Sequence, residues 1–204
     1  RSLSQPIVEL GSTVDDAAGE AYDKVAKLLG LGYPGGPIVD RLAATGNAEA
    51  IALPVTRLTH PDRNARDRDS SFDFSFSGVK TAVLRHVRAR QTALGVSRLP
   101  DAEIADLCAS FQRTVVQTLL RRTFEAARVH GAGAVGVAGG VSANSRLRAE
   151  LEVRGQTARL PVFVPPVSLS TDNAAMIGAA GLRAYRQGRI ASPDVNALPS
   201  LVLS

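Results

Sequence analysis

The sequence predicts an α/β fold, and two observations lead to this prediction. In the last third of the chain, two short aliphatic runs alternate with two helical patterns, an order that implies parallel pairing of the strands. Hydrophobic residues make up 45% of the 204 residues, whereas aromatic residues make up 4% and Trp is absent. A core of Ala, Val, Leu and Ile suits helices packed on buried strands. The length allows one large domain or two lobes with a shared core.

Three elements are expected in the first 44 residues: a strand over 7–10, a helix over 17–29 and a short helix over 38–44. Thr13, followed three residues later by Asp16, has the pattern of a capping box at the start of the first helix. The Tyr-Pro-Gly-Gly-Pro stretch at 33–37 predicts a loop, because Pro fixes φ and Gly adopts conformations that other residues avoid. The chain starts without Met, and we expect it to come from a longer protein.

The middle of the chain is expected to be mainly helical. Phe alternates with polar residues over 72–76, which predicts a half-buried strand, and residues 57–70 are polar and predict an exposed loop. Helices are expected over 79–90 and 100–130. Cys108 lies on the apolar face of the second of these helices, which favours a buried structural thiol over a nucleophile.

The last third carries the α/β alternation. The expected elements are a buried strand over 134–138, a turn at 139–140, a helix over 142–153, a strand over 161–164 and a final helix that Ser170 and Thr171 cap and that runs to about 187. Parallel strands end at the same edge of a sheet, where ligand sites of α/β proteins gather.

The charge and the histidines constrain the function only loosely. The net charge is +5, which fits an anionic partner about as well as a bland basic surface. No apolar run approaches the roughly 20 residues of a membrane span, and we expect a cytoplasmic protein with no membrane partner. His60, His86 and His130 show no ligand spacing, and the sequence contains neither H-E-x-x-H nor C-x-x-C.

The segment 138–144 offers the strongest candidate ligand site. Gly139 and Gly140 follow a predicted strand, and a helix N-terminus with free N–H groups comes next. Asn144, one turn into that helix, can donate and accept hydrogen bonds to a base or a ribose. A simple tight turn explains the two glycines equally well.

Acidic residues supply further candidates, each with a bland alternative. Asp172 stands at the start of the final helix, either as a first-turn acid favoured by the helix dipole or as a metal ligand. Gly35 and Gly36 with Asp40 form either a hydroxyl-binding corner or a turn. Four further acids form either a binding cluster or a solvated helix face: Asp15, Asp16, Glu20 and Asp23.

Five blocks of the sequence resemble the signature of the TsaD family, in family order, between residue 11 and about residue 188. They are Asp-Asp-Ala-Ala-Gly-Glu-Ala-Tyr-Asp-Lys at 15–24, Leu-Leu-Gly-Leu-Gly-Tyr-Pro-Gly-Gly-Pro at 28–37, Phe-Ser-Phe-Ser-Gly-Val-Lys-Thr-Ala-Val at 74–83, Ala-Gly-Gly-Val-Ser-Ala-Asn-Ser-Arg-Leu-Arg at 138–148 and Thr-Asp-Asn-Ala-Ala-Met-Ile at 171–177.

The resemblance implies a two-lobed fold of the actin, Hsp70 and sugar-kinase superfamily (ASKHA, ribonuclease H-like) with nucleotide bound between the lobes. It also implies transfer of a threonylcarbamoyl group from threonylcarbamoyl-adenylate to N6 of the adenosine beside the tRNA anticodon. The implied partners are tRNA and companion proteins of the same modification. By motif, the adenylate or ATP would contact Asp23, Gly36, Asp40, Gly139, Gly140 and Asn144, and Asp172 would ligate a divalent metal, iron or zinc. No catalytic residue is assigned.

Two motifs of the family are not found in these residues: an H-x-x-x-H pair for the metal and a Ser-Gly-Gly-His-Thr loop for the phosphates. We therefore expect residues 1–204 to be the C-terminal lobe, with a helical subregion over about 13–130, a nucleotide-binding subregion over about 131–190 and no metal-binding first lobe. Such a portion would be inactive by itself. The alternatives are a non-catalytic scaffold paralogue, a sugar or acetate kinase, and the metallopeptidase of an older family label.

Overall fold

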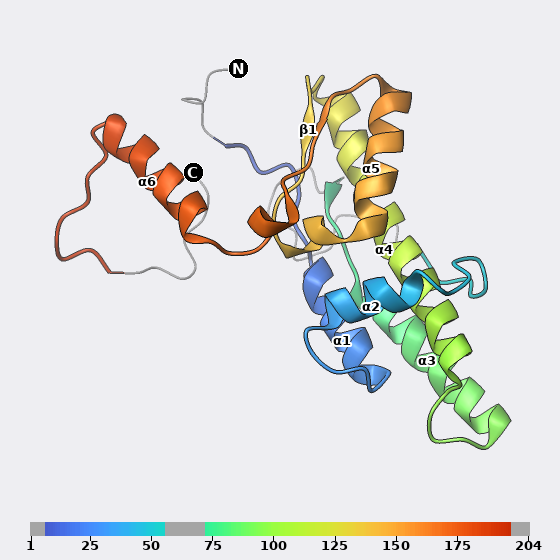
Figure 1. Ribbon diagram of the computed structural model, residues 1–204. Coiled ribbons are helices and arrows are strands. Elements are labelled where there is room, and N and C mark those ends of the chain that lie inside the picture. The colour runs from blue at the N-terminus through green and yellow to red at the C-terminus, as the bar shows by residue number, and fades with distance from the viewer. Residues whose placement is uncertain (1–6, 56–71, 197–204) are drawn as a thin grey trace.

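The computed structural model describes residues 7–55 and 72–196, and this part of the chain is mixed α/β, with six α-helices and one pair of parallel strands (Figure 1). The helices are α1 (Ala18–Leu28), α2 (Gly35–Ala43), α3 (Ser77–Leu94), α4 (Asp101–Val129), α5 (Ser145–Ala158) and α6 (Ala174–Arg186). The strands are β1 (Val135–Gly136) and β2 (Val162–Phe163), and the short 3₁₀ helices are η2 (Gly140–Ala143) and η3 (Val167–Leu169). No helix in this part of the chain is both long and apolar enough to cross a membrane.

The predicted parallel pairing is confirmed. Val135 of β1 stands opposite Val162 of β2, and the N–H of Val135 donates to the carbonyl of Pro161 at 2.9 Å. The two strands are shorter than the aliphatic runs suggested, and of the two residues of β1 only Val135 is buried. The crossover between them contains α5, as expected for a strand–helix–strand unit.

Helix α4 is the central element of the core. Its first half packs with α1, α2 and α3 around aliphatic residues and the fully buried ring of Phe111. Its second half packs with α5 and the strands around Val116, Leu120 and Leu151. The buried thiol of Cys108 belongs to the first cluster, as predicted, and burial raises its pKa to about 12. A continuous helix thus joins the two clusters.

Two predictions for the first 17 residues are wrong. Residues 7–10 form no strand, and all four are exposed. Helix α1 has no capping box, because its N-cap is Ala17 and no side chain caps it. The hydroxyl of Thr13 instead donates to the carbonyl of Asp16 at 2.8 Å, while the Asp16 carboxylate accepts from Lys24.

The strand predicted over 72–76 is also wrong. The backbone makes one isolated parallel bridge, between Thr13 and Phe74, and burial does not alternate along the segment. The helix predicted over 79–90 is confirmed with wider bounds, Ser77–Leu94. The helix predicted over 38–44 is also confirmed, but it spans Gly35–Ala43, so the loop predicted over 33–37 ends at Pro34. The loop predicted over 57–70 lies outside the described residues.

Helix α6 stands apart from the other helices, beyond the extended segment that follows β2 (Figure 1). None of its residues is buried, and Ile177 and Tyr185 are each 66% exposed. Its cap is Asn173, whose Oδ1 accepts from the N–H of Met176 at 3.0 Å, rather than Ser170 or Thr171 as predicted. The side chain of Ser170 faces α5 instead, where it accepts from Arg148.

Asp15 caps α3 from a distance of about 60 residues along the chain. Its carboxylate accepts from the hydroxyl of Ser75 at 2.5 Å and from the N–H groups of Phe76 and Ser77 at 2.8 and 3.3 Å. Burial opposes ionisation of Asp15, but these hydrogen bonds outweigh it and hold the pKa of the carboxyl below its usual value. The acid therefore stabilises the start of α3 in its charged form.

We expect the Asp15→Asn variant to be less stable than the unmodified chain at pH 7, with a difference that disappears in acid. A carboxyl whose pKa is lower in the folded state stabilises the fold above its unfolded pKa of about 4 and loses this effect as the pH falls through the folded pKa. Urea unfolding between pH 7 and pH 3 measures the difference, with Glu152→Gln, an exposed carboxyl on α5, as control. A constant difference across that range would contradict the assigned ionisation.

Candidate functional site

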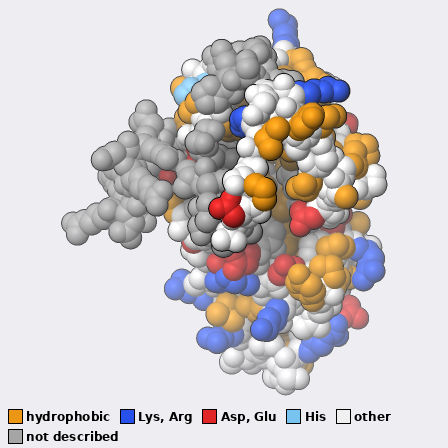
Figure 2. Space-filling view, turned by 90° about the vertical axis from the view of Figure 1, so that its left-hand side faces the viewer, with side chains coloured by type: hydrophobic (Ala, Val, Ile, Leu, Met, Phe, Trp, Pro, Cys, Tyr) orange, Lys and Arg blue, Asp and Glu red, His pale blue; other side chains and the backbone are white. Residues whose placement is uncertain are grey.

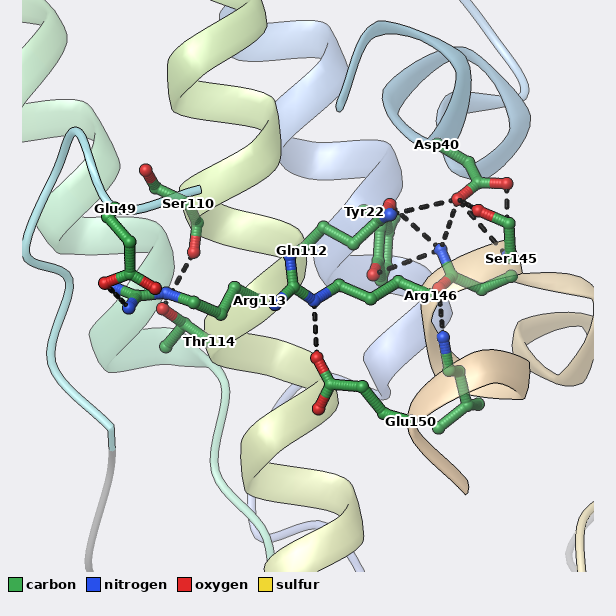
Figure 3. Close-up of polar contacts among 12 residues, drawn as sticks. Tyr22, Asp40, Glu49, Ser110, Gln112, Arg113, Thr114, Ser145, Arg146 and Glu150 are labelled. Atoms are coloured by element: carbon green, nitrogen blue, oxygen red, sulfur yellow. Dashed lines mark hydrogen bonds and ion pairs between the residues drawn. The ribbon is translucent and has the colours of Figure 1, made fainter. Parts of the chain in front are cut away.

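A cluster of polar side chains lies where α2, α4 and the start of α5 meet (Figure 3). Asp40 from α2, Gln112 from α4 and Asn144 before α5 are joined by hydrogen bonds of 2.9 to 3.1 Å. The hydroxyl of Tyr22 on α1 lies 3.5 Å from the same Asn144 amide. Four elements that are far apart in the sequence therefore contribute to one site.

The prediction that Asn144 lies one turn into the helix is wrong, because Asn144 is the N-cap of α5. Its Oδ1 accepts from the N–H of Leu147 at 2.9 Å, and its Nδ2 donates to Asp40 and Gln112. The side chain is only 8% exposed. Protein groups therefore already use most of the hydrogen-bonding capacity of the Asn144 side chain.

Asp40 combines one anchored oxygen with one that is nearly free. Its Oδ1 accepts from Gln112, Asn144 and the Ser145 hydroxyl, the last at 2.7 Å. Its Oδ2 accepts only from the Ser145 N–H, at 3.2 Å, among the hydrogen bonds of the described residues. A carboxylate oxygen has two lone pairs, so Oδ2 can accept a further hydrogen bond from a ligand.

Asp23 on α1 likewise has one carboxylate oxygen anchored by a hydrogen bond to the protein. Its Oδ1 accepts from the N–H of Gly35 at 2.7 Å, at the first residue of α2, and the side chain is partly exposed. Gly36 follows, and a Cβ placed there would meet nothing within 4 Å. The three residues of the predicted corner, Gly35, Gly36 and Asp40, therefore all lie on α2, and Asp23 contacts the first of them from α1.

The turn after β1 requires glycine at its first position. Gly139 has φ 83° and ψ 172°, a combination that is almost restricted to glycine. Gly140 then begins η2, and both glycines are exposed. As predicted, the pair forms the turn between strand and helix, although a 3₁₀ turn separates it from α5.

Tyr22 lies buried beneath Asn144, on the core side of the site. It is 2% exposed, and its ring packs edge-on against Phe111 with centroids 5.1 Å apart. Burial raises the pKa of Tyr22, and the charge of Asp40 raises it further, so the phenol stays neutral. Beneath the polar groups the site is therefore lined by packed aromatic rings.

Asp172 is exposed, and its segment is tied to α5 through Arg148. The Nη2 of Arg148 donates to the carbonyl of Pro165 at 2.6 Å and to the hydroxyl of Ser170 at 3.1 Å. Within residues 7–55 and 72–196, no group of three or more His, Cys, Asp or Glu side chains could hold a metal ion. The described residues therefore do not fit a complete metal site, although Asp172 could supply one ligand.

Two of the acidic residues in and just before α1 take part in ion pairs with lysines. Lys24 bridges Asp16 and Glu20, at 2.5 and 2.7 Å, and Lys80 also reaches Asp16. Hydrogen bonds from Lys24 and Lys80 lower the pKa of Asp16. The solvated-face alternative therefore fits only Glu20, since Asp15 caps α3, Asp16 is mostly covered and Asp23 contacts α2.

Sequence reasoning missed Tyr22, Gln112 and Ser145. Gln112 carried a usable signal, because it is a polar residue next to Phe111 and four positions after Cys108, on the buried side of α4. Tyr22 resembled an ordinary core aromatic, and Ser145 an ordinary surface residue. Their roles depend on contacts across more than 100 residues, which no local pattern encodes.

Charged side chains of both signs lie on the face drawn in Figure 2. Asp and Glu side chains lie mostly across its middle, whereas Lys and Arg side chains lie mostly below and above them, with hydrophobic side chains among both.

These features define a mixed α/β chain with a polar site at a strand–turn–helix junction, suited to a ligand that carries hydroxyl groups. The chain belongs to the TsaD family, described as tRNA N6-adenosine threonylcarbamoyltransferase, whose signature matches residues 3–179.

Three relatives carry the name tRNA N6-adenosine threonylcarbamoyltransferase. The protein from Koribacter versatilis is 48% identical over 96% of this chain and 57% of its own length. The protein from Acaryochloris marina is 46% identical over 96% of this chain and 52% of its own length. The protein from Sorangium cellulosum is 51% identical over 86% of this chain and 46% of its own length. The chain thus spans about half the length of the relatives it matches.

Proposed function

We propose that this chain carries the nucleoside-binding part of an enzyme that transfers a threonylcarbamoyl group from threonylcarbamoyl-adenylate to N6 of the adenosine beside the tRNA anticodon. Membership of the TsaD family and the names of the relatives support this proposal. In this proposal, residues 1–204 form a lobe of the actin, Hsp70 and sugar-kinase type. The strand–helix–strand unit from β1 to β2 is its nucleotide-binding portion.

The observation that carries the proposal is the available oxygen of Asp40. Its Oδ2 is held beside the start of α5 by the anchoring of Oδ1, so a carboxylate acceptor is fixed before a ligand arrives. A ribose diol or an amine donates to such an acceptor. The two exposed glycines of the turn let a ligand approach the backbone closely.

The residues have distinct roles in this proposal. Asp40 accepts from a hydroxyl of the adenylate, and Asp23 offers a second acceptor near Gly36. Gly139 and Gly140 line the backbone side of the site, whereas Asn144 acts mainly by holding Asp40 and the start of α5. The scaffold alternative predicts no nucleotide binding, so a binding measurement separates the two.

The family resemblance further implies a divalent metal, iron or zinc, with Asp172 as one ligand. Because the described residues do not fit a complete site, no step is assigned to the metal here. Transfer RNA, companion proteins of the modification and a cytoplasmic location belong to the same proposal.

We expect the Asp40→Asn variant to bind ATP at least about tenfold more weakly than the unmodified chain. Asn keeps an oxygen in the place of Oδ1, with its donors Gln112, Asn144 and the Ser145 hydroxyl, but replaces Oδ2 with an amide that accepts neither from a ligand nor from the Ser145 N–H. A lost hydrogen bond to a charged acceptor weakens binding by about tenfold or more. Isothermal titration calorimetry with the 204-residue chain measures the change.

Asp101→Asn is the matched control, because that side chain is 84% exposed at the start of α4, where it pairs with Arg98. Its affinity for ATP should equal that of the unmodified chain. Absence of ATP binding by the unmodified chain would refute the proposed nucleoside site.

A further inference from the structure

Among the described residues of α4, Gln112 is the one whose side chain forms hydrogen bonds with both Asp40 and Asn144. Its Nε2 donates to Oδ1 of Asp40 at 3.0 Å, and its Oε1 accepts from Nδ2 of Asn144 at 2.9 Å. The residue is 4% exposed and lies next to the fully buried Phe111. A glutamine so deeply buried on an otherwise apolar helix face is costly unless its amide is satisfied, and here both ends are bonded.

The bonds to Asp40 come from two directions. Asn144 and Ser145 donate to the carboxylate from the start of α5, whereas Gln112 donates from α4. Donors at the start of α5 alone would leave the carboxylate free to pivot with that segment. The donor on α4, which is the central helix of the core, fixes the second direction and hence the orientation of Oδ2.

The orientation of the Gln112 amide is determined by its partners. A carboxylate can only accept, so the group that faces Asp40 must be Nε2, and Oε1 must then face the Asn144 amide. The same logic fixes Asn144, whose Oδ1 already accepts from the N–H of Leu147. The chain Leu147, Asn144, Gln112, Asp40 thus has one consistent hydrogen-bond direction.

We propose that Gln112 is a positioning residue of the nucleoside site, which orients the Asp40 carboxylate and the Asn144 amide without touching the ligand. This inference rests on the proposed function and adds a residue of the buried core to it. Gln112 acts through Asp40, so its contribution should vanish when the free carboxylate oxygen is removed.

The test compares Gln112→Met with Gln117→Met. Methionine has a similar length but neither donates nor accepts as an amide does, and Gln117 is a partly exposed glutamine on the same helix. Titration calorimetry with ATP should give a dissociation constant about tenfold higher for Gln112→Met and an unchanged one for Gln117→Met. Added to Asp40→Asn, Gln112→Met should raise the dissociation constant for ATP by less than about threefold further, because Gln112 acts through Asp40.

A second measurement does not require a folded variant. In the unmodified chain, the side-chain amide protons of Asn144 should exchange with solvent at least about tenfold more slowly than those of the exposed Asn47, as followed by ¹⁵N–¹H spectroscopy. In Gln112→Met, the Asn144 signals should shift and exchange faster.

The outcomes are distinguishable. If the unmodified chain binds no ATP, the proposed function fails and this inference fails with it. If the unmodified chain and Gln112→Met bind ATP equally well, or if the losses from Gln112→Met and Asp40→Asn simply add, the inference fails and the nucleoside site stands. If Gln112→Met does not fold, fast exchange of the Asn144 amide in the unmodified chain refutes the inference, and slow exchange supports it.

Discussion

Gly35→Ala is expected to destabilise the chain by about 1 to 3 kcal/mol and to weaken ATP binding as well. A Cβ at this position would lie 2.7 Å from the Cβ of Ala26 and 2.8 Å from the carbonyl oxygen of Tyr22. Both contacts are with α1, and a backbone atom cannot move aside as the end of a flexible side chain can. Helix α2 would have to shift away from α1.

That shift also affects the site. The N–H of Gly35 donates to Asp23, and α2 carries Asp40 little more than one turn later. Moving the start of α2 therefore displaces both proposed acceptors relative to α5. Urea unfolding measures the stability, and calorimetry with ATP measures the binding.

Gly36→Ala is the matched control for stability, since a Cβ there would meet nothing within 4 Å. Ala is a better helix former than Gly by up to about 1 kcal/mol, so this variant should be as stable as the unmodified chain or slightly more stable. Equal stability of the two variants would show that the close contact of residue 35 with α1 does not decide the result.

The helices could be predicted from the sequence because apolar spacing reports a buried face directly. Helix α4 illustrates this, since its predicted range, 100–130, nearly equals the observed one. The strands were less predictable. Alternation over 72–76 suggested a strand, yet a strand needs a partner along its length, and among the described residues Phe74 makes a single bridge, to Thr13.

The candidate site could be predicted in part. The order strand, two glycines, helix located Asn144 near a helix start, and the parallel pairing of β1 and β2 followed from the same alternation. The identity of its partners could not be derived in this way. Asp40 lies 104 residues away from Asn144, and only the packing of α2 and α5 on α4 brings them within 3.1 Å.

Helix caps were predicted poorly for a physical reason. Several polar residues near a helix start compete for the same free N–H groups, and the sequence does not rank them. At α6 the N-cap is Asn173 rather than the predicted Ser170 or Thr171. The side chain of Ser170 is bonded to Arg148 on α5 instead. At α1 the side chain of Asp16 is engaged by two lysines instead.

Phe111→Ala is expected to cost about 3 to 5 kcal/mol of stability, the largest effect among these variants. The ring is fully buried in the main cluster, and its removal leaves a cavity beside Tyr22, whose ring lies 5.1 Å away. Tyr22 would then lose the edge-on contact that holds it under Asn144, so ATP binding should also weaken in the fraction that remains folded.

Phe163→Ala is the matched control, because this ring on β2 is 66% exposed. Its removal should cost less than about 1 kcal/mol, since little apolar surface leaves water there on folding. Phe111→Leu should fall between the two, because leucine fills part of the cavity but cannot make the aromatic contact. Thermal unfolding followed by circular dichroism ranks the three variants. If Phe163→Ala destabilised the chain as much as Phe111→Ala, the packing of Phe111 on α4 would not be the main source of stability.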